Sequence, residues 1–156
     1  MLPSKEFMDA AIDAAVKARD AGDYGVGAVI VKDNKIIACE GNKAVIDADP
    51  TQHAEVAAIR KAVKIIGSRF LEGCVLYTTH EPCPMCASAA IWARMTGIVF
   101  GASLRDMIDY RIKNGTKKRT WRTIDITAKE VLEKGDPKLL LVEDFMRDEC
   151  RNLFHQ

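Results

Sequence analysis

A histidine, two cysteines and a glutamate stand at spacings that suit a metal site with one open position. His53 and Glu55 are two residues apart, and the thiols form a Cys-x-x-Cys pair at Cys83 and Cys86. One imidazole and two thiolates supply three ligands for a tetrahedral zinc ion, whereas a structural zinc site normally has four protein ligands. Water would take the fourth position, and Glu55 could handle the protons of that water. We therefore predict a catalytic zinc site at His53, Cys83 and Cys86, with Glu55 as the acid and base.

Each part of this group also has a plainer interpretation. A glutamate in the first turn of a helix interacts favourably with the helix dipole. The pair Cys83 and Cys86 could be a redox couple, or half of a structural zinc site with His80 as the nearest candidate for a fourth ligand. A redox couple gives no role to the histidine and the glutamate, so the four residues together favour the catalytic site.

Two helices are expected to carry these residues. An apolar pattern with helical period follows His53 and Glu55, and another follows the cysteine pair. The pattern predicts helices over residues 5–21, 53–66 and 84–94. Thr51 is placed to cap the second of these, and Pro84 suits the start of the third. A hairpin over 27–31 and 35–40 and strands over 74–79 and 97–101 complete the first two thirds of the chain. Gly25 and Gly27 would let the backbone approach a ligand or form a bulge.

The pattern after residue 103 is less regular. It predicts a short helix over 104–110, a fifth strand over 123–127 and a helix over 128–134. A terminal helix is predicted over 137–154, although residues 139–142 alone could be a strand. The alternation of strands and helices implies crossover connections and a largely parallel sheet covered on both faces.

His-x-Glu followed by Pro-Cys-x-x-Cys is the signature of the zinc-dependent base deaminases, in which the glutamate is not a ligand. The chain resembles the cytidine deaminase-like superfamily, in the branch that holds bacterial guanine deaminase, fungal cytosine deaminase and the tRNA adenosine deaminases. The resemblance rests on DPTQHAE (49–55) and LYTTHEPCPMC (76–86) and extends from about Phe7 to about Asp106. It implies an α/β fold, a three-layer α/β/α sandwich with a mixed, largely parallel five-stranded sheet, and a single zinc-dependent deaminase domain over residues 1–156.

The resemblance also implies substrate contacts. Asn42 matches a position where the free-base deaminases of the family place an amide against the substrate ring, and an amide can both donate and accept. Alternatively, Asn42 could simply follow Gly41 in a left-handed conformation. The backbone N–H of Ala54 would point at the substrate. We expect His80 near the site, in a role other than that of a metal ligand.

The substrate itself stays open. DPTQHAEVAAIR (49–60) and Trp92-Ala93-Arg94 look most like the guanine deaminase group. This implies ammonia release from a small nucleobase within purine salvage, with guanine favoured and cytosine or a related aminated heterocycle as further candidates. Val26 stands where that group has an aromatic residue, and the segment after Asp106 departs from it. The alternatives are a tRNA adenosine deaminase and a non-catalytic interaction module that zinc stabilises.

One basic stretch bears on the tRNA alternative. Arginine and lysine beside an aromatic ring can bind phosphate and stack a base. Such residues are gathered at Arg111, Lys113, Lys117, Lys118, Arg119, Trp121 and Arg122. A solvated loop is the plainer interpretation, and a net charge of +1 gives no overall attraction for nucleic acid.

The composition is that of an ordinary globular protein, with 48% apolar and 29% charged residues in 156. The sequence contains no run long and apolar enough for a transmembrane helix and no signal peptide pattern, so we expect a cytoplasmic protein without membrane contact. Cys39, Cys74 and Cys150 are expected to be free thiols. The exposed edges of the sheet and the habit of the family predict a homodimer, with Trp92 in the core or at the subunit interface.

Overall fold

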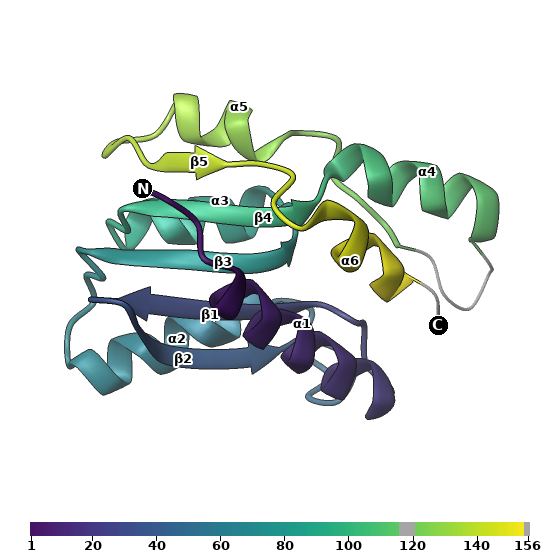
Figure 1. The fold of residues 1–156 in the computed structure, drawn as a ribbon, viewed down its shortest axis with the longest axis horizontal. Helices are drawn as coiled ribbons and strands as arrows, with labels where there is room; N and C mark the ends of the chain where they lie inside the picture. Colours follow the sequence, from purple (N-terminus) through teal and green to yellow (C-terminus); the bar gives the residue numbers. More distant parts are fainter. Residues whose placement is uncertain (116–120, 155–156) are drawn as a thin grey trace.

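The computed structural model describes residues 1–115 and 121–154 (Figure 1). The strands are β1 (Gly27–Lys32), β2 (Lys35–Gly41), β3 (Cys74–His80), β4 (Gly97–Ala102) and β5 (Leu140–Val142). The helices are α1 (Lys5–Asp20), α2 (Ala54–Ile66), α3 (Pro84–Trp92), α4 (Leu104–Asn114), α5 (Ala128–Glu133), α6 (Arg147–Arg151) and the short 3-10 helix η1 (Asn152–Phe154). The elements predicted before residue 103 are all present, with ends that differ by one or two residues from the predicted ranges.

The five strands form one mixed sheet in the order β2-β1-β3-β4-β5. β1 pairs antiparallel with both β2 and β3, whereas β3 with β4 and β4 with β5 pair in parallel. A mixed sheet was predicted, but only two of its four pairings are parallel. The reason is the position of β1. The crossover through α2 does connect strands of the same direction, β2 and β3, but β1 lies between them.

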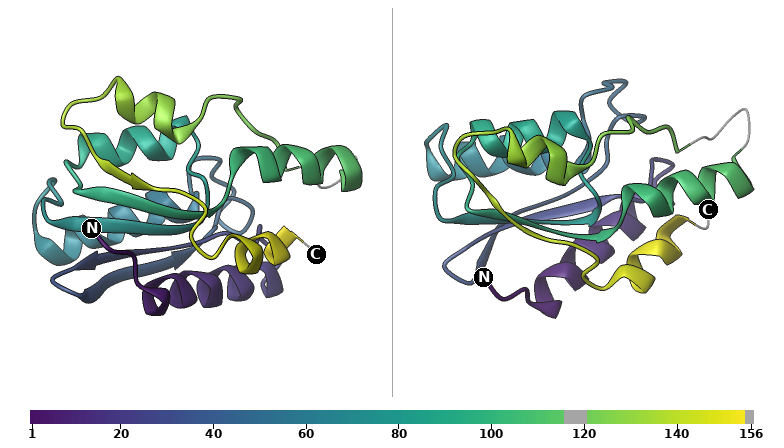
Figure 2. Two further views of the ribbon diagram at one scale, coloured as in Figure 1. Left: turned by 45° about the horizontal axis from the view of Figure 1, so that its top comes forward. Right: turned by 90° about the horizontal axis from the view of Figure 1, so that it is seen from above.

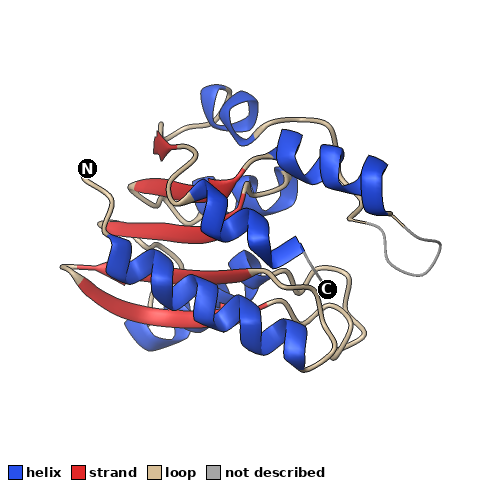
Figure 3. Cartoon of the chain, turned by 45° about the vertical axis from the view of Figure 1, so that its right-hand side comes forward, coloured by secondary structure: helices blue, strands red, loops and turns tan. Residues whose placement is uncertain are grey.

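Helices cover both faces of the sheet, which confirms the three-layer arrangement (Figures 2 and 3). Successive residues of a strand point to opposite faces. Accordingly, Ala28 and Ile30 of β1 belong to one core cluster with residues of α2, α3 and α5. Val29 and Val31 belong to the other cluster, with residues of α1, α6 and η1. The apolar run of β1 is therefore buried on both sides, as expected for a strand inside a covered sheet.

Two predictions for the C-terminal third of the chain are wrong. Residues 123–127 do not form a strand, because Thr127 caps α5 and its hydroxyl accepts the N–H of Glu130. The fifth strand is instead β5, and the helix predicted over 137–154 is divided into β5, α6 and η1. Leu139 and Leu141 pack into the same core cluster, two residues apart, and this period belongs to a strand.

The scattered cysteines are free, as predicted, and Cys74 and Cys150 are buried. Trp92 lies at the end of α3 with 81% of its surface exposed, which excludes the core and leaves the interface as a prediction. Within the described residues, no helix has the length and hydropathy to cross a bilayer.

Asp106 ties the start of α4 to the C-terminal segment. Its carboxylate accepts the Ser103 N–H at 3.0 Å, and its own N–H donates to Ser103 Oγ at 3.1 Å, which forms a capping box. Arg147 of α6 donates to both carboxylate oxygens, at 2.7 and 2.9 Å. Burial works against ionisation, but the hydrogen bonds from Arg147 and Ser103 prevail and lower the pKa of Asp106 to about 2.

Replacing this carboxylate should weaken the fold in a pH-dependent way. Asp106→Asn is expected to lower the free energy of unfolding at pH 7 by about 2 kcal/mol, through loss of the charged hydrogen bonds and part of the cap. Because the folded pKa lies below the usual 3.8, the carboxylate stabilises fully above about pH 4, and this contribution is lost as the pH falls through about 2. Urea unfolding over this range should show wild type and variant converging.

Asp109→Asn is the matched control, since Asp109 is half exposed and paired only with Arg105 at 3.4 Å among the interactions found. Its effect should stay below about 0.5 kcal/mol. Equal effects of the two substitutions, or a difference that does not change with pH, would contradict the role given to Asp106.

Candidate metal centre and active site

The N-termini of α2 and α3 bring the predicted ligands together. His53 occupies the N-cap position of α2 and Cys83 that of α3, and neither side chain makes a capping hydrogen bond. Thr51, predicted to cap α2, instead bonds through its hydroxyl to Asp49 at 2.7 Å. The imidazole and the thiol are therefore directed away from their own helices and toward each other, and Cys86 follows in the first turn of α3.

The three ligand atoms form a nearly regular triangle. His53 Nδ1 lies 3.6 Å from Cys83 Sγ and 3.6 Å from Cys86 Sγ, and the two sulfur atoms are 3.7 Å apart. Tetrahedral coordination with Zn–S near 2.3 Å and Zn–N near 2.0–2.1 Å separates two sulfurs by about 3.8 Å and sulfur from nitrogen by about 3.6 Å. The residues thus fit a zinc ion in both type and spacing.

The donor set has three members, not four. Among the described residues, the group whose ligand atoms lie within 4.8 Å of one another is His53, Cys83 and Cys86. His80, the candidate fourth ligand, is not in it, and its Nδ1 lies 2.7 Å from Thr79 Oγ1. The hydrogen bond shared between Cys83 and Cys86 lowers the pKa of Cys83 to about 4, so this site already favours a thiolate. Three ligands leave a coordination position for water, as catalytic zinc sites do.

Glu55 lies beside this triangle and is buried, with 4% of its surface exposed. Its Oε1 accepts a hydrogen bond from Thr78 Oγ1 at 2.8 Å, and its Oε2 lies 3.5 Å from Cys86 Sγ. Burial raises the pKa of Glu55 above its usual value. A carboxyl group so placed can hold a proton at neutral pH more readily than an exposed one, which suits a proton shuttle.

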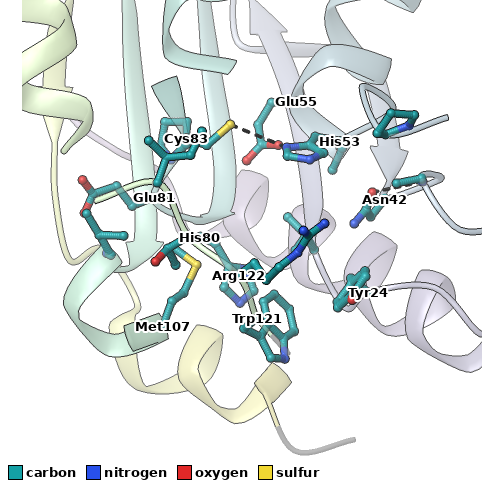
Figure 4. A pocket seen from close by; sticks show the side chains of 18 of the residues that line it. Tyr24, Asn42, His53, Glu55, His80, Glu81, Cys83, Met107, Trp121 and Arg122 are labelled. Carbon is teal, nitrogen blue, oxygen red and sulfur yellow. Dashed lines mark hydrogen bonds between the residues drawn. The ribbon is translucent and has the colours of Figure 1, made fainter. Parts of the chain in front are cut away.

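A pocket of about 510 Å³ opens beside the triangle (Figure 4). Asn42 and Ala54, predicted to contact substrate, both line it. Asn42 is buried and its Oδ1 accepts the Ala44 N–H at 3.2 Å, which leaves its Nδ2 as a donor. Its φ is not positive, so the left-handed interpretation is wrong. Ala54 begins α2, where the N–H has no partner within the helix.

Sequence reasoning missed the side chain that holds the loop with Asn42 in place. Asp23 is buried, and its Oδ2 accepts the N–H groups of Val45 and Ile46, both at 3.0 Å. The signal for it is weak, because an aspartate between Gly22 and Tyr24 is typical of any turn. Its carboxylate fixes the backbone that follows Asn42, and so fixes one wall of the pocket.

The far wall comes from residues assigned above to a basic or solvated loop. Trp121 and Arg122 line the pocket together with Tyr24, on the side opposite His53 and Glu55 (Figure 4). The Trp121 ring contacts that of Tyr24 edge to face, with centroids 5.3 Å apart. The solvated-loop interpretation is therefore wrong for Trp121, whereas Lys117, Lys118 and Arg119 lie outside the described residues. The sequence signal for this role is a single tryptophan within a run of polar residues.

Comparison with known families agrees with this geometry. The model of the cytidine and deoxycytidylate deaminase zinc-binding region matches residues 1–102, which include every member of the donor set. The chain belongs to this family.

Several relatives within the family are similar to the chain. Guanine deaminase of Bacillus subtilis (strain 168) is 48% identical over 101 residues, 64% of this chain, and the match spans a little under two thirds, 65%, of that protein. A probable cytosine deaminase of Schizosaccharomyces pombe is 32% identical over 92% of this chain and 85% of its own length. A solved structure from a study of tRNA:A34 deaminases superposes with a TM-score of 0.80 at 28% identity, over 96% of this chain and 99% of that one.

Zinc content tests the donor set directly. The purified protein should hold about one zinc ion per chain, and His53→Ala or Cys83→Ala should weaken zinc binding by at least about 100-fold, because each removes a ligand atom. Cys39→Ala is the matched control, since Cys39 is a free, half-buried thiol on β2 and should leave zinc content unchanged. Elemental analysis after dialysis against a chelator measures both. Full retention of zinc in either ligand variant would exclude the site as drawn.

Proposed function

We propose that this protein is a zinc-dependent hydrolytic deaminase that releases ammonia from a small nucleobase. Guanine is favoured, with cytosine or a related aminated heterocycle as further candidates. The observation that carries the proposal is the triangle of His53, Cys83 and Cys86, with the buried carboxyl group of Glu55 beside it at a pocket. A redox couple would not need the imidazole at 3.6 Å from both thiols, nor Glu55.

In this mechanism the metal is held by His53, Cys83 and Cys86. When bound, a zinc ion supplies a water with a pKa lowered to roughly 7. Glu55 would take a proton from the water and pass it to a ring nitrogen of the base, which makes the ring carbon electrophilic toward the water oxygen. Once that oxygen is bonded to the carbon, Glu55 would carry the oxygen's remaining proton to the amine, which leaves as ammonia when the C–N bond breaks. Thr78 donates to Oε1 of Glu55 at 2.8 Å, and Oε2, which lies 3.5 Å from Cys86 Sγ beside the triangle, would exchange the protons.

Substrate recognition is assigned to the walls of the pocket. The Nδ2 of Asn42 and the N–H of Ala54 are donors for the edge of a base. Tyr24 and Trp121 supply aromatic surface, which suits a flat heterocycle. Because these rings lie opposite the triangle, a flat base could be held between them and the metal ligands. The similarity to a guanine deaminase over 101 residues supports guanine as the favoured base.

A second candidate is a tRNA adenosine deaminase. It is supported by the similarity to the tRNA:A34 deaminase structure, which extends over nearly the whole chain. Arg122 is exposed at the pocket and could contact a phosphate. Arg111 is less free to do so, because its guanidinium donates to Thr123 Oγ1 at 2.9 Å.

Further parts of the proposal concern the whole protein. We also propose a single catalytic domain, a cytoplasmic location and a role in purine salvage. A homodimer with Trp92 at its interface would cover the exposed ring at the end of α3. A non-catalytic zinc-stabilised module would leave Glu55 without a function, and the next experiment distinguishes it.

Glu55→Gln should abolish turnover and keep the metal. The amide fills the same space but cannot carry the proton, so we expect kcat to fall by at least about 100-fold. The assay is ammonia release by the zinc-loaded protein from guanine, cytosine, adenine, their nucleosides, related aminated heterocycles and an anticodon stem-loop, with zinc content measured in parallel. Release that survives the substitution unchanged would refute the mechanism. No release from any compound would favour the non-catalytic module.

Binding of an anticodon stem-loop separates the two enzyme candidates. For a free-base enzyme we expect weak binding that changes little with salt. A tRNA enzyme that neutralises several phosphates would lose affinity steeply, with a slope of about −0.7 in log affinity per log salt for each contact to a single strand. Fluorescence anisotropy between 50 and 200 mM salt measures this slope, with Arg122→Gln as the variant that should reduce it by about one contact. A steep slope sensitive to Arg122 would move the protein to the tRNA branch.

A further inference from the structure

Arg122 places an unpaired positive charge at the pocket. It lines the cavity beside Trp121, and Figure 4 shows its side chain reaching from the Trp121 side toward His53. Within the described residues, its guanidinium makes no hydrogen bond, ion pair or ring contact. Residues 116–120 and 155–156 contain no aspartate or glutamate, so the sequence there offers no acidic side chain as a partner. The charge is therefore available to a ligand.

The chain on either side of Arg122 is anchored. Arg111 of α4 donates to the Trp121 carbonyl oxygen at 3.5 Å and to Thr123 Oγ1 at 2.9 Å. The Trp121 ring also stacks on His80, with centroids 5.1 Å apart and planes 19° apart. Arg122 thus lies between two fixed neighbours while its own side chain stays unpaired. An arginine presented in this way can form charge-assisted hydrogen bonds with a ligand without first breaking an ion pair.

The acidic groups at the pocket are engaged elsewhere. Glu81 is buried, and its two carboxylate oxygens accept the N–H groups of Leu104 and Ala128, both at 2.8 Å. Glu55 accepts the hydroxyl proton of Thr78 and belongs to the proton transfer. Of the described residues that line the pocket, one has a lysine or arginine side chain. The pocket therefore offers a ligand a single guanidinium.

A single guanidinium matches a carboxylate better than a phosphate monoester. The planar fork of arginine donates two parallel hydrogen bonds to a carboxylate. A carboxylate carries one negative charge, whereas a phosphate monoester carries about 1.5 to 2 at pH 7. The cavity of about 510 Å³ has the size of sites that bind drug-sized ligands, so it has room for a base with a substituent.

We propose that Arg122 binds a carboxylate on the substrate, so that the protein acts on an acidic aminated heterocycle in preference to its neutral form. The proposal rests on the deaminase function proposed above and adds a substrate class to it. The amine that is released must lie at the metal ligands and Glu55. Because Arg122 lines the opposite side of the pocket, the carboxylate belongs on the ring edge away from that amine.

Pairs of a carboxylate and its carboxamide test this assignment, since the two have nearly the same shape and differ in charge. Suitable pairs are guanine-8-carboxylate with guanine-8-carboxamide, and cytosine-6-carboxylate with cytosine-6-carboxamide. In ammonia release by the zinc-loaded protein, we expect Arg122→Gln to lower the ratio of kcat/KM for the acid to that for the amide by about 10-fold or more. Arg122→Lys should recover part of the ratio, because it keeps the charge and loses the fork.

The ratio within a pair cancels any general effect of a substitution on turnover. Arg105→Gln is the matched control, since Arg105 is exposed, pairs with Asp109 at 3.4 Å and does not line the pocket. It removes the same charge and should leave the ratio unchanged. An unchanged ratio in Arg122→Gln, or an equal loss in the control, would overturn the proposal. Stronger turnover of nucleoside monophosphates than of either carboxylate, or turnover of the stem-loop alone, would also overturn it.

Binding without turnover separates this proposal from the proposed function. Xanthine-8-carboxylate and uracil-6-carboxylate have no amine to release, and each has a matching carboxamide. Calorimetry on the zinc-loaded protein should show at least one of these acids binding about 10-fold or more tightly than its amide, and Arg122→Gln should remove the difference. If no base is deaminated but this preference is present, the deaminase function fails and the assignment of Arg122 stands. If bases are deaminated but neither acid is preferred, the assignment of Arg122 fails alone.

Discussion

The site depends on one constraint, the convergence of the N-termini of α2 and α3 at the same end of the sheet. Both helices pack into the same core cluster against one face. α2 leads into β3 and α3 leads out of it toward the parallel strand β4, so both helices begin near the carboxyl end of β3. Ligand sites in α/β sheets lie at this end of the strands. The partial positive charge of two helix starts favours the thiolates that a metal requires.

The sequence was most informative where local chemistry determines the structure. The long helices have unbroken apolar periodicity, and the residue types of His53, Glu55 and the cysteine pair limit the chemistry even without their distances. Gly27 illustrates the opposite case. A Cβ at position 27 would collide with the backbone oxygen of Ala11 in α1. The glycine is therefore required by the close packing of α1 against β1, and not by a ligand.

The errors fall on short apolar runs and on contacts between distant residues. The apolar run that contains Leu139 and Leu141 is too short for its periodicity to distinguish a helix from a strand. It forms a strand because it pairs with the edge of β4. Trp121 could not be placed from its neighbours in sequence, since its partners Tyr24, His80 and Phe154 are 33 or more residues away. The periodicity of apolar residues does not reveal contacts between residues that are far apart in the sequence. The unpaired guanidinium of Arg122 at the pocket is likewise a property of the folded state alone.

The metal ligands and one part of the pocket lining therefore come from different parts of the chain. The family match ends at residue 102, whereas Leu104, Met107 and Trp121, which also line the pocket, come after it. Glu81 joins the two parts: it stands beside the cysteine motif, and its buried carboxylate accepts the N–H groups of Leu104 and Ala128, both at 2.8 Å. The motif thus fixes where α4 and α5 begin, while the side chains they carry can differ without disturbing the metal site.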